Sequence, residues 1–283
     1  MYDTLEEIEG IEEVYLANPY KTRAIADARI KTDKIDSRTL ADLLRGNLIP
    51  ALWIPPKDTR EIKNIARYRI FLVKERVRIK NRIHNIIDRN HLEKPRVSDI
   101  FGRYGIEWLR EVEMRERERK LLDKHIQMYE WISERIKEVE RWIEEEVGED
   151  EDIRLLRSIP GIGKVFAVII KVEIGDIERF ASYKKLHSYS GLVPRVYQSG
   201  KRRYYGRLVK RCNLNLRWAI IESAVSSIRV SVYFNREYRR VKERAGIQAG
   251  IISTGRKLAT IVYKVLKERR EYREIVEGDN RRR

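Results

Sequence analysis

The sequence has little of the chemistry on which disulfide-bonded proteins and small zinc sites depend. Its 283 residues include one cysteine, Cys212, and four scattered histidines. A single cysteine excludes an internal disulfide framework and a multi-cysteine zinc site. No apolar run reaches the length of a membrane span, and the N-terminus lacks the basic-then-apolar pattern of a signal peptide. These absences predict a cytoplasmic protein without a membrane partner.

Acidic residues are missing from one long stretch, residues 179–221. An even spread of the 44 acids would place about six or seven in a window of this length, whereas eleven Lys and Arg do occur there. The two halves of the chain differ accordingly. Residues 151–283 hold 31 basic and 13 acidic side chains, and residues 1–150 hold 30 and 31. This division predicts that the second half holds a polyanion.

The centre of the acid-free stretch, residues 194–207, combines five cations with three tyrosines around Ser199-Gly200. Cations suit phosphates, and aromatic faces suit stacked bases or sugars. A basic hairpin loop on a soluble protein is the alternative interpretation. The candidate nucleic-acid-binding cations are Arg195, Lys201, Arg202, Arg203, Arg207, Lys210, Arg211 and Arg217.

Residues 159–164, Ile-Pro-Gly-Ile-Gly-Lys, separate two apolar-periodic segments, so the sequence predicts a tight turn between helices. This pattern is typical of a helix-hairpin-helix. Its glycines permit unusual backbone angles and close approach of a phosphate, and the start of a helix favours an anion. Gly161, Gly163 and Lys164 are therefore further candidates for contact with a nucleic-acid backbone.

The predicted fold is mainly α-helical. After Pro55-Pro56, apolar residues recur at helical steps up to about His91, and a second such helix runs to Val147 after a short connector. Both seams are narrow, so each needs a partner, either the other helix or another subunit. We expect an antiparallel helical or coiled-coil domain over 58–148, an acidic linker at 148–152, and a helical domain over 153–283.

The first segment, residues 1–57, is less regular. Residues 11–16 predict a strand, although a lone strand cannot satisfy its backbone hydrogen bonds. Asp33 and Asp36 lie one turn apart at the start of a predicted helix. Spacing alone does not separate a capping arrangement from a metal-binding pair.

Several of these segments, taken together, resemble transposases of the insertion-sequence 110/116/902 type. The motifs occur in the order seen in that family: residues 31–36, 159–163, 191–194 and 199–200, then Asn213 with Leu216-Arg217, and residues 256–258. The resemblance implies a ribonuclease-H-like (RuvC-like) α/β domain of which 1–57 is a residual C-terminal piece. A coiled coil and a C-terminal transposase domain with a helix-hairpin-helix would follow.

Carried over residue by residue, the resemblance assigns Asp33 and Asp36 to the family's four Mg²⁺-binding acids and Ser199 to the serine that attacks DNA. It also implies DNA and a guide (bridge) RNA as partners. Without the family, Ser199-Gly200 would be interpreted as an ordinary hairpin turn. A homo-oligomer through the coiled coil is a further expectation.

The sequence departs from the family pattern in two places. The strands that carry the family's first Asp and its Glu have no counterpart after Met1, so we expect an N-terminally truncated copy. Cys212 stands where members typically have glycine. Two functions therefore stay open: a transposase that cuts and rejoins DNA, and a truncated, inactive remnant that only binds nucleic acid. Two carboxylates are too few for the usual two-metal site.

Overall fold

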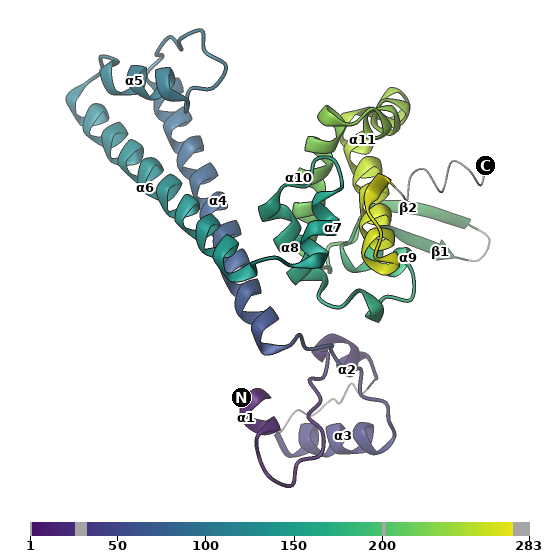
Figure 1. The fold of residues 1–283 in the computed structure, drawn as a ribbon. Helices are drawn as coiled ribbons and strands as arrows, with labels where there is room; N and C mark the ends of the chain where they lie inside the picture. The colour runs from purple at the N-terminus through teal and green to yellow at the C-terminus, as the bar shows by residue number, and fades with distance from the viewer. Residues whose placement is uncertain (1, 26–32, 200–201, 274–283) are drawn as a thin grey trace. The chain divides into compact units, whose positions relative to one another are not determined.

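A computed structural model describes residues 2–25, 33–199 and 202–273 (Figure 1). The chain divides into two compact units, residues 1–56 and 57–283, each of which is described by itself below. Most described residues are helical, as the apolar periodicity predicts.

The described part of the first unit contains three short helices: α1 (Tyr2–Glu6), α2 (Pro19–Ile25) and α3 (Asp33–Arg45). The predicted strand over residues 11–16 is wrong, because the described part of this unit forms only a single antiparallel bridge, between Ala17 and Ala51. Two backbone hydrogen bonds surround that bridge, from Asn18 to Pro50 at 3.0 Å and from Leu52 to Leu16 at 2.8 Å. With one bridge only, the segment has no ladder that would fix it as a strand.

In the second unit, α4 (Lys57–Arg89) and α6 (Glu116–Val147) are the two predicted long helices, and they pack antiparallel along their length (Figure 1). Cross-helix ion pairs fix the direction: Arg69 contacts Glu140 at 2.6 Å near one end, and Arg89 contacts Glu118 near the other. The seams are buried against each other. Of the two partners that the sequence allows, the structure therefore provides the other helix of the same chain.

The connector between these helices is more ordered than expected, because it contains α5 (Arg103–Glu111). Leu109 is fully buried, and a Cβ added at Gly105 would come within 2.2 Å of the carbonyl oxygen of Ile100. Phe101 packs against Tyr129 of α6 with ring centroids 5.1 Å apart. These contacts explain why a segment with weak periodicity folds onto the helical pair.

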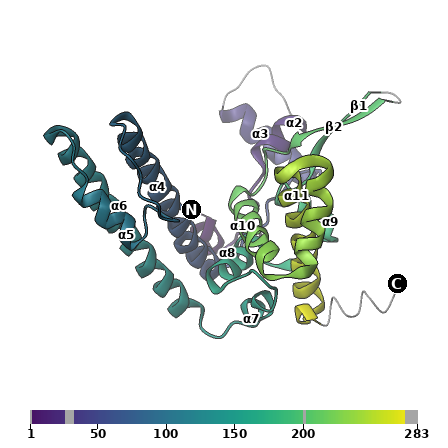
Figure 2. The ribbon, with the colours of Figure 1, turned by 90° about the horizontal axis from the view of Figure 1, so that it is seen from above.

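The remaining described elements of this unit are α7 (Glu151–Arg157), α8 (Lys164–Ile174), the 3₁₀ turn η1 (Ile177–Arg179), α9 (Tyr183–Tyr189), the strands β1 (Pro194–Ser199) and β2 (Arg202–Leu208), α10 (Leu214–Val230) and α11 (Val232–Glu268). In this part of the unit, α8 contacts α7 and α10, and α11 contacts α7, α9 and α10 (Figure 2). Residues 167–170, 172 and 174 of α8 are buried. A helix that is apolar nearly all round must be covered on several sides, and α4, α6, α7 and α10 all contact it.

The acidic linker, residues 148–152, joins α6 to α7, and three of its four carboxylates are engaged. Asp150 caps α7 by accepting from the backbone N–H of Ile153 at 3.1 Å, and it also ion-pairs with Lys171 of α8. Asp152 and Glu151 both ion-pair with Arg269, just after α11. The linker is therefore held by ion pairs to α8 and to the residue that follows α11.

Candidate nucleic-acid interface

Strands β1 and β2 form an antiparallel hairpin in the middle of the acid-free stretch. Figure 1 shows it extending away from the surrounding helices. Its register pairs Tyr197 with Tyr204 and Ser199 with Arg202. The two tyrosine rings stack, with centroids 4.8 Å apart and planes 12° from parallel, and they are 42% and 63% exposed. A flat, exposed aromatic pair of this kind offers a stacking surface to a base or sugar.

Gly206 allows this arrangement. A Cβ at that position would come within 2.8 Å of the ring of Tyr197. The glycine therefore leaves room for the tyrosine to lie across the neighbouring strand and meet Tyr204.

Arg217 of α10 holds the base of the hairpin from one side. Its Nε donates to the carbonyl oxygen of Ser190 at 3.2 Å, and its terminal nitrogen donates to the carbonyl of Val209 and contacts Sγ of Cys212 at 2.8 Å. A Cβ at Gly191, where φ is +64°, would collide with this guanidinium. The side chain is thus engaged within the chain and fixes where β1 begins and β2 ends.

Arg256 of α11 holds the base from another side. Its Nε donates to the carbonyl oxygen of Leu192 at 2.5 Å. One turn later, the Thr260 hydroxyl donates to the carbonyl of Arg256 at 3.0 Å and lies 3.1 Å from Nε2 of His187 in α9. With that hydroxyl donating to the carbonyl, the tautomer that fits this contact carries its proton on Nε2 of His187. Burial, followed by the charge of Arg256, holds the pKa of His187 below its ordinary value, which favours a neutral ring.

Glu173 of α8 links α4 to the start of α10, and sequence reasoning missed it. The carboxylate is 1% exposed and receives Arg67 of α4 through two hydrogen bonds, of 2.6 and 3.0 Å, and Lys63 at 3.2 Å. Asn213, the N-cap of α10, donates to it at 2.8 Å, and Asn215 donates at 3.3 Å. The one acid of a mainly apolar helix is the sequence signal that could have identified it.

The charge state of Glu173 follows from these partners. Burial opposes ionisation, but the hydrogen bonds from Arg67 and Asn213 and the charges of Lys63 and Arg67 outweigh it, so the pKa of this carboxyl lies below its ordinary value. The side chain is therefore an anion that joins α4, α8 and the start of α10.

The two glycines of the 159–164 turn are not equivalent. Gly161 has φ +93°, and a Cβ there would lie 2.4 Å from the backbone nitrogen of Ser227 in α10, whose hydroxyl donates to the carbonyl of Pro160 at 2.6 Å. Gly163, the N-cap of α8, has φ −80° and faces open space. Lys164 ion-pairs with Glu144 of α6 at 3.4 Å. Packing thus explains Gly161, whereas the open side of Gly163 leaves the start of α8 accessible.

Four of the candidate cations lie exposed on or beside the hairpin: Arg195, Arg207, Lys210 and Arg211. Lys201 lies outside the described residues, as do the side chains of Ser199, Arg202 and Arg203. The structure therefore places Arg195 and Arg207 on the strands that carry the stacked tyrosines, and it places Arg217 at the base of the hairpin.

The proposed metal ligands belong to the first unit. Asp33 begins α3 and its side chain lies outside the described part, whereas Asp36 is exposed on the same helix. Among the described residues, no three His, Cys, Asp or Glu side chains lie close enough together to hold a metal ion. The described donors thus do not make a complete Mg²⁺ site, and we derive no chemical step through one.

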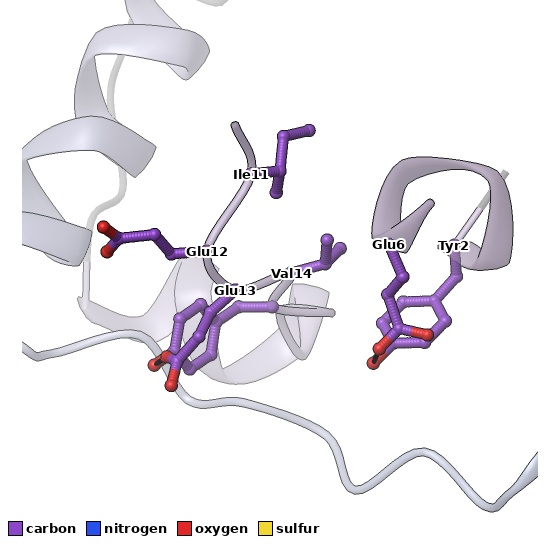
Figure 3. A pocket seen from close by; sticks show the side chains of 7 residues that line it. Tyr2, Glu6, Ile11, Glu12, Glu13 and Val14 are labelled. Atoms are coloured by element: carbon purple, nitrogen blue, oxygen red, sulfur yellow. Dashed lines mark hydrogen bonds between the residues drawn. The ribbon is translucent and has the colours of Figure 1, made fainter. Parts of the chain in front are cut away.

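An acidic hollow of about 420 Å³ opens in the first unit, lined by residues 2, 6 and 11–15 (Figure 3). Glu6 accepts a hydrogen bond from the Tyr2 hydroxyl, and Glu13 accepts one from Tyr15. Because two of its three carboxylates are already engaged with tyrosines, we assign no ligand to this hollow.

Among the described helices, none is long and apolar enough to cross a membrane. Comparison with known families matches two regions. Residues 153–239 match the "Transposase IS116/IS110/IS902 family", and residues 4–91 match a DEDD domain of the IS110 type described as "Transposase". The first match includes the 159–164 turn and the hairpin, and the second includes Asp33 and Asp36.

Curated relatives agree with these matches. The chain is 27% identical to the "Transposase for insertion sequence element IS1328" of Yersinia enterocolitica, over 75% of this chain and 63% of that protein. It is 30% identical to the "Transposase for insertion sequence element IS1111A" of Coxiella burnetii, over 44% and 35%. It is 36% identical to the "Pilin gene-inverting protein" of Moraxella bovis, over 42% and 38%. The chain thus spans less than two thirds of each of these relatives.

Proposed function

The chain belongs to the IS116/IS110/IS902 family of transposases, and from that premise we propose that it recombines DNA for a mobile insertion element, with Ser199 as the nucleophile. In this proposal the unit formed by residues 57–283 grips the nucleic acid and presents Ser199 from the hairpin. DNA is the proposed substrate, and a guide RNA is a proposed partner by resemblance to the family.

The observation that carries the proposal is the construction of the hairpin. Its base is fixed by Arg217 and Arg256, its exposed surface offers the Tyr197–Tyr204 stack, and no acid occurs between residues 179 and 221. Fixed anchors at the base reduce the motion of the strands above them, and exposed cations neutralise phosphates. Ser199 ends β1, two residues after Tyr197.

The chemical step would exchange one phosphodiester for another. The serine oxygen would form a bond to phosphorus while the bond from phosphorus to one strand oxygen breaks, and the proton lost by the serine is balanced by the proton gained by the released strand end. The covalent link conserves the ester for rejoining. Arg195 and Arg207 would orient the strand beside the tyrosines.

The test is incubation of the full chain with labelled DNA, structured RNA from the flanks of its own element and a divalent cation, followed by denaturing electrophoresis. We expect a protein-linked band that Ser199→Ala abolishes and Ser188→Ala, an exposed serine of α9, leaves intact. A band that survives Ser199→Ala would refute the assignment of the nucleophile. Binding with no band in the wild type would favour the alternative function, nucleic-acid binding without cleavage.

A further inference from the structure

Helix α11 is not continuous, and its first part forms a separate feature. At Gly246 the backbone leaves the helical conformation, with φ +85° and ψ 172°, so residues 232–245 and 247–268 are two legs of a helical hairpin. We call residues 232–245 the arm. Tyr238 of the arm packs on Gly250, where a Cβ would come within 2.8 Å of its ring, and Ser253 donates to Glu237 at 2.8 Å. The arm is thus fixed against the second leg.

The outward side of the arm is strongly cationic. Five cations are exposed within nine residues: Arg236, Arg239, Arg240, Lys242 and Arg244. Arg239, Arg240 and Arg244 follow Arg236 by three, four and eight residues, so all four arginines share one face of the helix. This face is opposite the buried Phe234. Of the two acids in the arm, Glu237 is engaged with Arg240 and Ser253. Glu243 is exposed on the same face, one turn from Arg239 and Arg240, so this face carries four arginines and one acid.

The long helices show that the same residue types need not make such a surface. On α6, exposed cations alternate with acids and pair with them: Lys120 with Glu116, and Lys137 with Glu134. On the arm, Arg236, Arg239 and Arg244 have no acidic partner among the residues that the structure describes. Unpaired like charges repel one another, so a row of this kind is relieved by a bound polyanion.

We propose that the arm is a second nucleic-acid-binding surface, which takes the sugar–phosphate backbone of a duplex. The arm is about 21 Å long at 1.5 Å per residue, and it is rigid through its packing on the second leg. Tyr233 and Tyr238 are both half-buried, so within residues 232–248 no exposed ring offers the stacking that single strands require. Figure 1 shows the first part of α11 well apart from the β1–β2 hairpin.

The ligand class rests on the proposed function, but the surface is distinct from the hairpin. The hairpin combines cations with exposed aromatic rings, which suits a strand with accessible bases. The arm offers charge alone, which suits a regular backbone and no particular sequence. DNA and RNA duplexes share this chemistry, so the experiment includes both.

The test compares three triple variants of the full chain with the wild type. The arm variant is Arg236→Gln, Arg239→Gln and Arg244→Gln, and the hairpin variant is Arg195→Gln, Arg207→Gln and Lys210→Gln. The control variant is Arg103→Gln, Lys120→Gln and Lys137→Gln, which removes the same charge from exposed, acid-paired sites. Fluorescence anisotropy measures affinity for a labelled DNA duplex, the matching RNA duplex and the single DNA strand at several salt concentrations.

We expect the arm variant to bind duplex about tenfold or more weakly, with the slope of log K against log salt smaller by about two to three, and to bind the single strand nearly as the wild type does. A duplex loss in only one of the two nucleic acids identifies which backbone the arm takes. Arm and control variants that behave alike would overturn the proposal, and an equal loss on the single strand would overturn its duplex assignment. If only the hairpin variant loses affinity for nucleic acid, the arm is not a binding surface and the hairpin is. If only the arm variant loses affinity, the hairpin is not a binding surface, and the proposed function loses its main support.

Discussion

The Nε atom of Arg256 in α11 donates to the carbonyl oxygen of Leu192, two residues before β1, at 2.5 Å. These residues are 64 positions apart in the sequence, and each belongs to a different motif of the family. Together with Arg217, this contact makes the motif cations anchors of the hairpin as well as sources of charge. The contribution of this hydrogen bond to the stability of the second unit can be measured.

Arg256→Gln should destabilise the second unit by about 1.5–3 kcal/mol, because a hydrogen bond from a charged donor is lost and the Leu192 carbonyl is left without it. Denaturant unfolding gives the free energy, and tryptic cleavage after residues 201–203 reports loosening of the hairpin. Arg229→Gln, at an exposed arginine of α10, is the matched control. Equal stability and equal cleavage in the two variants would contradict the anchoring role.

Glu173→Gln should cost about 3–5 kcal/mol at neutral pH, because Arg67 and Lys63 lose their buried partner. Since the folded-state pKa of Glu173 lies below the ordinary value of 4.5, its stabilisation is present above that pH and is lost as pH falls through the folded pKa. The free-energy difference between wild type and variant should therefore shrink below about pH 4.5. Glu222→Gln, at an exposed acid, should change stability by less than about 0.5 kcal/mol.

Gly161→Ala should destabilise by about 2–4 kcal/mol, because φ is +93° and the new methyl group would collide with Ser227. Gly163→Ala has space and an ordinary φ, so its cost should stay within about 1 kcal/mol. Thermal unfolding of both variants separates the two glycines. Equal costs would show that the turn does not pack on α10 as described.

Self-association through α4 and α6 stays a prediction. The surface that would mediate it is the exposed apolar face of α6, in place of the narrow seams. The narrow seams are used inside the chain, while Leu121, Met128, Trp131 and Trp142 of α6 are 40–60% exposed. A second copy of the chain would cover these exposed apolar side chains.

A Trp131→Lys, Trp142→Lys double variant should therefore sediment as a smaller species than the wild type at micromolar concentration. Tyr104→Lys, at a 74% exposed ring of α5, is the control and should sediment as the wild type does. A wild type that is already monomeric would refute the prediction.

The sequence by itself determined the long helices, the turn at 159–164 and the basic centre of the second half. Periodicity and turn chemistry act over a few residues, so they can be interpreted without knowing the fold. Charge counting likewise locates the five cations of residues 194–207, for which a basic hairpin loop is the alternative interpretation, and the structure forms a β-hairpin there.

Only the tertiary structure decided which of these residues hold the site together. Gly161 and Gly163 look alike in the sequence, and so do Arg195 and Arg217, yet in each pair packing contacts hold one residue and leave the other open. Glu173 becomes a buried anion only because Arg67, 106 residues earlier, and Asn213, 40 residues later, reach it. Such contacts join segments that no local pattern relates, and the free energy of burying a charge depends on those distant partners.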